Sequence, residues 1–299
     1  MRVLTNIKTE NHGLLAAFLA IVGWSSAGIF INLLPELSAV SIVSFRLTVA
    51  LIVSTLLLLL MKRNIFVYLK ELNNFAVWGL GLILFFCYLL GTLAFQKAPV
   101  GEITLLMTTS PLFVMAYKIF FNESIKKVEF LGLFLAIFGI LFITYPQLST
   151  TTSNVIPERL IGDSFALIGS FLFATYAIWY RSLRKKDVAP NTISVALGTF
   201  IIGAMLFIVT VDEMLIVQKV SSNVSLLLGI GILSTAIPTV SYAVASKELK
   251  PLVSTSLLLL QPPLATLFAL LILSEIPTIW TIPGLIFILI GLMLIVRSK

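Results

Sequence analysis

The feature that most constrains this chain is a segment of sequence that occurs twice, 152 residues apart. In each copy, a Pro-led apolar stretch contains a second Pro and ends at a Glu, and the next apolar stretch carries two Gly seven residues apart. The residues that repeat at this offset are Pro99 and Pro251, Pro111 and Pro263, Glu123 and Glu275, Gly132 and Gly284, and Gly139 and Gly291. Five identities without a gap predict two related halves, and in an apolar chain such repeats are typical of membrane transporters.

The composition indicates that the solvent of this chain is lipid. Of its 299 residues, 59% are hydrophobic and only 11% are charged, whereas soluble domains carry about 25% charged residues. The formal net charge is +7, but the basic residues lie at the ends of apolar runs and not on one face, so we expect no nucleic-acid partner. With one cysteine, Cys87, and one histidine, His12, the chain has no internal disulfide or zinc site, and we expect no metal and no cofactor.

Hydropathy predicts an all-α integral membrane protein, because ten apolar runs are long enough to cross a bilayer as helices. The runs are 14–34, 40–61, 75–96, 99–121, 129–146, 162–181, 191–211, 224–245, 251–273 and 279–297. A polar, Ser/Thr-rich linker at 147–161 divides them into two sets of five. This division predicts one repeat over residues 1–146 and a second over residues 162–299.

The distribution of Lys and Arg predicts that both termini lie in the cytoplasm. In that orientation, sixteen basic residues lie inside and three outside, while Arg46 lies within a run. Because each half then has an odd number of helices, the second half is upside down relative to the first. Inverted repeats of this kind predict a substrate site near mid-membrane, between the halves.

This arrangement resembles the EamA family of the drug/metabolite transporter superfamily, whose members have ten helices in two inverted five-helix halves. The motifs that carry the resemblance are Ser110-Pro111 through Glu123 to Gly132 and Gly139, the second copy from Pro262-Pro263 to Gly291, Phe45-Arg46, and Trp24. One departure is that Ser25 and Ser26 follow Trp24, where the family often has Gly and then Asn. The resemblance implies transport of amino acids, other metabolites or drug-like molecules, mostly as export.

Arg46 is the clearest candidate for a functional residue. It lies about six residues inside the second run, and a charge near mid-bilayer costs about 2.5–3.5 kcal/mol on insertion scales. We therefore expect it to face a cavity or a partner. One hypothesis is that it attracts a carboxylate of the substrate or holds an outward gate. The alternative is that it reaches the outer surface or pairs with Glu36 or Glu102.

Pro111 and Pro263 are candidate hinges, because a proline inside a helix removes a backbone donor and clashes with the carbonyl four residues earlier. The freed carbonyls, with Ser110 and Gln261 beside them, could line a substrate cavity. The alternative is a fixed kink set by packing.

Trp24, Tyr88, Tyr176 and Tyr242 are candidate cavity-wall residues. They lie deep in their runs, where their polar atoms need partners, whereas other Trp and Tyr residues of membrane proteins form belts at the interfaces. Hydroxyl groups such as that of Thr92 could add to the same wall or bond their own helix backbone. Packing between helices is the alternative for all four aromatic residues.

Two pairs of glycines are interpreted as packing residues, because a spacing of seven puts both members on one helix face and small residues let helices approach closely in lipid. The pairs are Gly132 with Gly139 and Gly284 with Gly291. A second repeat of glycines, at an offset of 150, relates Gly79 and Gly81 to Gly229 and Gly231.

Glu123 and Glu275 end the fourth and ninth runs, at opposite membrane interfaces. Proton coupling is one hypothesis for them, and an ordinary role in fixing the turn is the alternative, because carboxylates at an interface are well solvated. The runs offer no other convincing proton carrier. This favours uniport, exchange, or coupling through a group that the sequence does not identify.

Other classes of membrane protein fit the sequence less well. It has no phosphate-binding loop, no metal-ligand motif and no repeated ring of residues that would mark a channel filter. A lipid-modifying enzyme and a non-transporting assembly protein are the alternatives that we keep. An intramembrane arginine with polar residues near the prolines favours transport over a purely structural bundle.

We therefore predict a secondary transporter, with export favoured, in a bacterial inner membrane. Its substrate would be a small organic metabolite such as an amino acid, carried by alternating access between the two halves. The predicted binding residues are Trp24, Arg46, Tyr88, Ser110, Tyr176, Tyr242 and Gln261. Its partners are this solute and the lipid bilayer, and a homodimer stays open.

Overall fold

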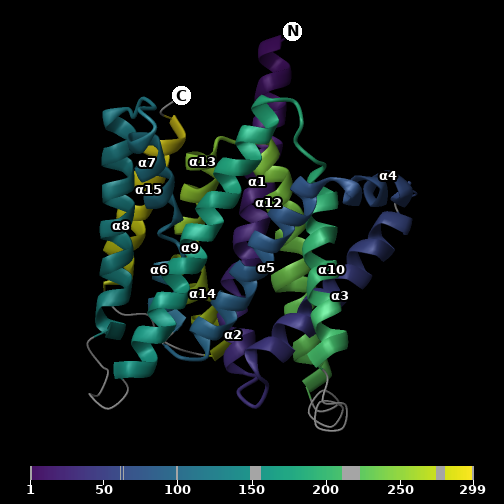
Figure 1. Ribbon diagram of the computed structural model, residues 1–299. Helices are drawn as coiled ribbons and strands as arrows, with labels where there is room; N and C mark the ends of the chain where they lie inside the picture. The colour runs from purple at the N-terminus through teal and green to yellow at the C-terminus, as the bar shows by residue number, and fades with distance from the viewer. Residues whose placement is uncertain are drawn as a thin grey trace.

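The computed structural model describes residues 2–60, 62, 64–98, 100–148, 156–210, 223–273 and 280–297, and the regular elements in them are all helices (Figure 1). Up to residue 148 they are α1 (Arg2–Ser25), α2 (Ala27–Asn32), α3 (Ala39–Leu60), α4 (Ile65–Lys70), the 3-10 turn η1 (Glu71–Asn73), α5 (Phe75–Phe95), α6 (Val100–Met107), α7 (Ser110–Phe120) and α8 (Lys127–Leu148). From residue 156 they are α9 (Ile156–Lys185), α10 (Thr192–Thr210), the π-helical turn η3 (Ile232–Ala236), α12 (Ile237–Glu248), α13 (Pro251–Leu257), the 3-10 turn η4 (Leu258–Leu260), α14 (Gln261–Leu273) and α15 (Thr281–Arg297). Pro99, Glu275 and residues 149–155 of the predicted linker 147–161 lie outside the described residues.

Helix covers most of each of the ten predicted runs as far as they are described, and α9 begins at Ile156, inside the predicted linker 147–161. Two further differences lie outside the runs. The first is that α1 begins at Arg2, well before the predicted start at residue 14. The second is that α4 and η1 occupy a segment for which we predicted a loop. The Asn64 side chain caps α4 by accepting a hydrogen bond from Phe66 N–H at 3.1 Å. Phe66 is 80% exposed, as suits a short helix at a membrane interface.

Six helical segments are long and apolar enough to cross a membrane. They are Asn11–Asn32, Ala39–Leu60, Phe75–Phe95, Leu160–Lys185, Asn223–Glu248 and Pro251–Ile272. Shorter apolar helices are found at Ser110–Phe120, Thr192–Phe207 and Ile282–Ile295. Large apolar side chains such as Phe134 and Leu271 are 60% and 70% exposed on the outside of the bundle, where lipid would cover them. These features confirm an all-helical integral membrane protein.

Four of the predicted spans are irregular within the bundle: the eighth contains the π-helical turn η3, and three others are interrupted. The first is broken at Ser26, where the Ser25 and Ser26 hydroxyls donate to the carbonyls of Ile21 and Gly23 at 2.7 Å each. Such bonds compete with the helix ladder and bend helices. The fourth is broken between α6 and α7, with Pro111 in the first turn of α7, because this proline has no N–H to continue α6.

The ninth predicted span is interrupted by η4, directly before Pro262 and Pro263. Neither proline can donate to the carbonyl four residues earlier, which is the reason that a regular α-helix stops there. The structure therefore has separate helices at Pro111 and a change of helix type before Pro263, where the sequence alone predicted kinks in continuous helices.

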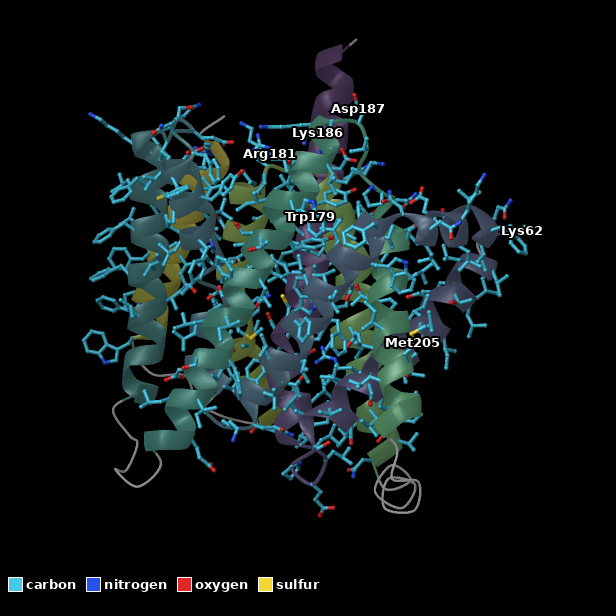
Figure 2. All side chains as sticks on the ribbon, in the orientation of Figure 1. Lys62, Trp179, Arg181, Lys186, Asp187 and Met205 are labelled. Atoms are coloured by element: carbon cyan, nitrogen blue, oxygen red, sulfur yellow. The ribbon has the colours of Figure 1, made fainter. Side chains whose placement is uncertain are left out.

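Figure 1 places both ends of the described chain at the same end of the bundle. Figure 2 shows Arg181 and Lys186 at that end, while Met205 lies nearer the opposite one. The bundle therefore has one end at which the N-terminus, the C-terminus and these basic side chains gather.

The helices α8 and α15 pack with their backbones in close approach. A Cβ atom on Gly139 would lie 2.4 Å from the Gly284 carbonyl oxygen, and one on Gly132 would lie 2.6 Å from the Gly291 carbonyl oxygen. The residue number rises from Gly132 to Gly139 along α8, while that of the contacted residue falls from Gly291 to Gly284 along α15. The two helices are therefore antiparallel. Other pairs of helices in contact are α1 with α12, α5 with α9, and α3 with α10.

The close approach of α8 and α15 yields the first prediction. Replacing Gly139 by Ala forces the two backbones apart, so we expect the free energy of unfolding to fall by about 1–3 kcal/mol. Gly169→Ala is the matched control, because the nearest atom to its new methyl group is Leu90 Cβ at 3.8 Å. We expect the control to be neutral or slightly stabilising, because glycine costs a helix about 0.5–1 kcal/mol relative to alanine. Unfolding in mixed micelles measures both, and equal stabilities would contradict this packing.

Candidate functional site

Arg46 lies inside the bundle with its charge almost completely removed from solvent. The residue is 2% exposed. Its Nε donates to Thr235 Oγ1 at 2.7 Å, its Nη2 to the Ser234 carbonyl at 3.1 Å, and its Nη1 to Thr92 Oγ1 at 3.4 Å. Its Cζ atom lies 4.6 Å from the centre of the Tyr88 ring, which adds a cation–π contact. Neutral groups of two other helical segments therefore hold the guanidinium.

The acceptors for Arg46 exist because of a local irregularity in the helix before α12. Pro238 has no N–H, so the Ser234 carbonyl loses its ordinary helical partner, and Arg46 supplies a donor in its place. The Thr235 hydroxyl donates to the Ile230 carbonyl, five residues back, across the π-helical turn η3. Turns of this kind are frequent at functional sites. The Ser26 hydroxyl, at the break between α1 and α2, lies 2.6 Å from the Ser234 hydroxyl.

A directed chain of hydrogen bonds runs beside the arginine. Trp24 Nε1 donates to the Tyr88 hydroxyl at 3.0 Å, and the Tyr88 hydroxyl bonds to Thr239 Oγ1. The Thr239 hydroxyl donates in turn to the Thr235 carbonyl at 2.6 Å. This chain connects α1, α5 and α12 and satisfies polar groups that would otherwise be costly to bury.

Arg46, Trp24, Tyr88 and Gln261 line one internal cavity of about 90 Å³. Its wall also contains hydroxyl groups and aromatic rings, including Ser25, Thr92, Thr104, Ser170 and Phe173. The structure thus brings together four of the seven residues that we predicted for substrate binding. The other three, Ser110, Tyr176 and Tyr242, are buried outside this lining.

Tyr176 and Tyr242 belong to an aromatic cluster with Trp24 and Phe173. The Tyr242 ring centre lies 4.7 Å from that of Phe173, 5.2 Å from that of Trp24 and 6.4 Å from that of Tyr176. Both tyrosines are at most 1% exposed. Trp24 and Phe173 also line the cavity, so the cluster meets the cavity through these two rings.

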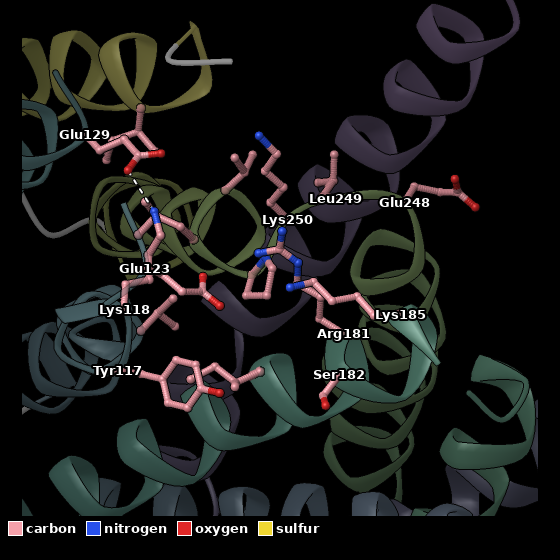
Figure 3. A pocket seen from close by; sticks show the side chains of 16 residues that line it. Tyr117, Lys118, Glu123, Glu129, Arg181, Ser182, Lys185, Glu248, Leu249 and Lys250 are labelled. Carbon is pink, nitrogen blue, oxygen red and sulfur yellow. Dashed lines mark hydrogen bonds and ion pairs between the residues drawn. The ribbon is translucent and has the colours of Figure 1, made fainter. Parts of the chain in front are cut away.

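A second pocket, of about 230 Å³, lies beyond the aromatic cluster (Figure 3). Along α9, residues of the cluster lie between Ser170 of the cavity and Arg181 of the second pocket. Charged side chains line this pocket, and Lys118 Nζ forms an ion pair with Glu129 Oε2 at 2.8 Å. The aromatic cluster therefore separates a cavity that contains Arg46 from a pocket that contains several charged side chains.

Glu123 is exposed at the second pocket, and the backbone accounts for the turn at this position. The Glu123 N–H donates to the Lys118 carbonyl at 2.8 Å, and Asn122 takes the left-handed conformation with φ of 51°. These are the features of a helix C-cap motif. The carboxylate is therefore free to face the pocket.

Sequence reasoning missed Ser234, Thr235, Thr239 and Phe173 as neighbours of the site. A signal was present in Pro238, which lies within an apolar run and follows Ser234 and Thr235, as Pro111 follows Ser110. The described residues contain no group of three or more His, Cys, Asp or Glu side chains that could hold a metal ion.

Apolar helices long enough to cross a bilayer, with an internal cavity lined by a buried arginine, define an integral membrane protein. The sequence matches the EamA-like transporter family twice, over residues 11–145 and 160–297. The chain therefore belongs to the EamA-like transporter family.

Two bacterial proteins are similar to this chain over part of their length. An uncharacterized transporter of Clostridium kluyveri is 26% identical over 194 residues, which cover 62% of this chain and 60% of that protein. The uncharacterized transporter YdfC of Bacillus subtilis is 26% identical over 213 residues, which cover 70% and 67%. The alignment thus spans less than two thirds of the Clostridium protein. A crystal structure of another protein shares the fold, with a TM-score of 0.75 over 94% of this chain and 95% of that one at 18% identity.

The hydrogen bonds of Arg46 yield the second prediction. Thr235→Val preserves shape but removes the acceptor of Arg46 Nε, so we expect the free energy of unfolding to fall by about 1–3 kcal/mol. Thr199→Val is the matched control, because Thr199 is equally buried and its hydroxyl bonds only to the Val195 carbonyl of its own helix. Unfolding in mixed micelles compares the two variants. An effect of Thr235→Val no larger than that of the control would contradict the role of Thr235.

Proposed function

We propose that this chain is a secondary transporter that binds a small organic metabolite beside Arg46 and exports it by alternating access. Amino acids and related carboxylates are the solute class that we favour. The observation that carries the proposal is a buried cation at the wall of an internal cavity, with no ion pair to a carboxylate among the described residues. A charge kept in the membrane interior is a candidate functional group. In a family of transporters, solute binding is the function that uses it.

Contacts between α8 and α15 support two inverted halves, which we infer to be residues 1–146 and 162–299, joined by the linker 147–161. Gly132 lies against Gly291, and Gly139 lies against Gly284. The sequence repeat relates Gly132 to Gly284 and Gly139 to Gly291. Replacing each glycine by its equivalent in the other half therefore turns the first contact into the second and the second into the first. A two-fold axis between the halves requires such an exchange. Because the two equivalent helices are antiparallel, that axis would lie in the membrane plane.

Three further pairs of glycine contacts are related to each other in the same way, by a difference in residue number of 149 to 150. The contact of Gly13 with Glu248 is equivalent to that of Gly162 with Ala98. In the same way, the contact of Gly79 with Trp179 is equivalent to that of Gly229 with Phe30, and the contact of Gly81 with Thr199 is equivalent to that of Gly231 with Val49. These contacts join α1 to α12 and α5 to α9, among other helices. Because equivalent contacts are found at several different pairs of helices, they support an inversion that relates the whole of one half to the whole of the other.

We infer ten spans, with both termini in the cytoplasm of a bacterial inner membrane. Besides the six segments described above as able to cross a membrane, four predicted spans remain, and they contain α7, α8, α10 and α15. An even number of crossings agrees with chain ends at one end of the bundle (Figure 1). Arg181 and Lys186 at that end agree with the excess of basic residues on cytoplasmic loops (Figure 2).

The two pockets support a mechanism in which each faces one side of the membrane. The cavity at Arg46 is bounded by Ile31, Phe95 and Thr104, at the predicted outer ends of their helices, so this conformation would face outward. The aromatic cluster would then be the inner barrier, with Tyr176 and Tyr242 as parts of it.

In the inward-facing conformation, we propose that the cluster separates and that the cavity joins the second pocket. The helix breaks before Pro111 and Pro263 are the candidate hinges. Rotation there would bring Ser110 to the solute, while Gln261 already lines the cavity.

The third prediction tests transport directly. Proteoliposomes that contain the wild type should move at least one labelled solute from a panel of amino acids and organic acids. Arg46→Ala should reduce that movement about 10- to 100-fold, because a charge-assisted hydrogen bond contributes about 1.5–3 kcal/mol.

The control for this experiment is Lys186→Ala, which removes an exposed charge far from the cavity and should move the solute at the wild-type rate. Monodispersity in detergent checks that each variant is folded. Equal transport by a folded Arg46→Ala variant would remove Arg46 from the mechanism. A wild type that moves no solute would favour an assembly protein or a lipid-modifying enzyme.

The fourth prediction tests the orientation. In a Cys87→Ala background, Ser38→Cys should react with a membrane-impermeant thiol reagent added to intact spheroplasts, and Asp187→Cys should react only after lysis. Both positions are exposed loop residues, so accessibility depends on the side of the membrane that they face. The reverse pattern would contradict cytoplasmic termini, and labelling of both in intact spheroplasts would contradict an even number of spans between the N-terminus and residue 187.

A further inference from the structure

The charges around the cavity restrict which solute can bind there. Among the side chains that the structure describes in its lining, Arg46 is the one that is ionised at neutral pH. The other polar groups are neutral hydroxyls, the Gln261 amide, the Trp24 indole and the Cys87 thiol. An empty cavity therefore carries a net charge of +1 from the described residues, in surroundings of low dielectric constant.

Arg46 has unused capacity for hydrogen bonds. A guanidinium has five N–H donors, and three of those of Arg46 bond to Thr235, Ser234 and Thr92. The other two have no acceptor among the described residues. A carboxylate accepts two parallel hydrogen bonds from a guanidinium, in the geometry that makes such pairs strong. The cavity can therefore complete the coordination of Arg46 with a carboxylate of the solute.

A zwitterion fits this site less well than an anion. Its carboxylate would neutralise Arg46, but its ammonium group would find no carboxylate among the described lining residues and would restore the net charge of +1. An unpaired charge in the membrane interior is costly. We propose that the solute is a small organic monoanion, a carboxylic acid without an ammonium group, whose carboxylate binds Arg46. This inference rests on the transport function proposed above and narrows its substrate class.

The rest of the cavity suits the carbon skeleton of such an acid. Trp24, Leu84, Phe173 and Leu258 provide apolar and aromatic surface close to Arg46. The cavity has a volume of about 90 Å³ in this conformation, which favours a small skeleton. The solute thus has one charged end at Arg46 and an apolar end against the aromatic cluster.

The net charge of the side chains that line the second pocket is positive, as it is for the cavity at Arg46. Its lining contains the four cations Lys118, Arg181, Lys185 and Lys250 and the three anions Glu123, Glu129 and Glu248. Lys118 is paired with Glu129, and Arg181 and Lys250 both line this pocket (Figure 3). A monoanion would therefore meet an excess of positive charge on both sides of the aromatic cluster.

The fifth prediction compares, within each of two series of related compounds, members that differ in charge. The probes are 3-phenylpropanoate, phenylalanine, 3-phenylpropanamide and 2-phenylethylamine, together with the smaller series of 4-methylpentanoate, leucine and 4-methylpentanamide. Ligand-dependent stabilisation of the detergent-solubilised protein reports binding without requiring transport. We expect at least one of the two carboxylates to bind about tenfold or more tightly than its amino acid, and the amides and the amine to bind more weakly still.

The variants connect this preference to Arg46. Arg46→Gln should lose the preference for the carboxylate, Arg46→Lys should keep part of it, and Lys186→Gln should leave it unchanged. Binding of an amino acid at least as tight as that of its carboxylate, or no stabilisation by either carboxylate, would overturn the proposal. Uptake of the same compounds into proteoliposomes separates the two proposals. Transport of amino acids alone would keep the transporter and refute the monoanion, whereas Arg46-dependent carboxylate binding without any transport would keep the anion site and refute the transporter.

Discussion

The rest of the structure depends on keeping the charge of Arg46 inside an apolar bundle. Three neutral acceptors and the face of Tyr88 surround the guanidinium, and they come from α5 and from the helical segment at η3. A buried cation without such groups would cost far more than the bundle could recover from packing there. The π-helical turn and Pro238 have a clear role in this respect, because together they expose a carbonyl that an ordinary helix would have used.

Close packing elsewhere allows the centre to remain polar. Where α8 meets α15, glycines let the two backbones touch, and dispersion contacts replace the hydrophobic force that is absent between helices in lipid. Near Arg46, by contrast, the helices are interrupted at Ser26, at η3 and before Pro111 and Pro263. The irregular segments thus concentrate around the cavity, and the regular helices form the outer wall. This distribution satisfies the rule that irregular backbone within a membrane is tolerated only where protein or a cavity surrounds it.

The aromatic cluster explains why two of the predicted residues lie away from the cavity. Tyr176 and Tyr242 were expected at the wall because their hydroxyls need partners, but burial of their rings against Trp24 and Phe173 determines their place. Packing of large rings contributes more than one hydroxyl group does, and the Tyr242 hydroxyl donates to the Ser254 hydroxyl of α13 at 3.4 Å. In the proposed cycle, this layer prevents free passage between the two pockets.

The sequence by itself determined that this chain is an all-helical membrane protein of a transporter family, because long apolar runs and a repeated motif are properties of local and periodic sequence. It also identified Arg46, since a lone charge in an apolar run is visible without a structure. Only the tertiary structure decided which groups meet that charge. Thr235 is 189 residues from Arg46 in the chain, and their contact depends on the rotation and depth of two helices. Those quantities result from the packing of all the helices at once, so no local pattern could have specified them.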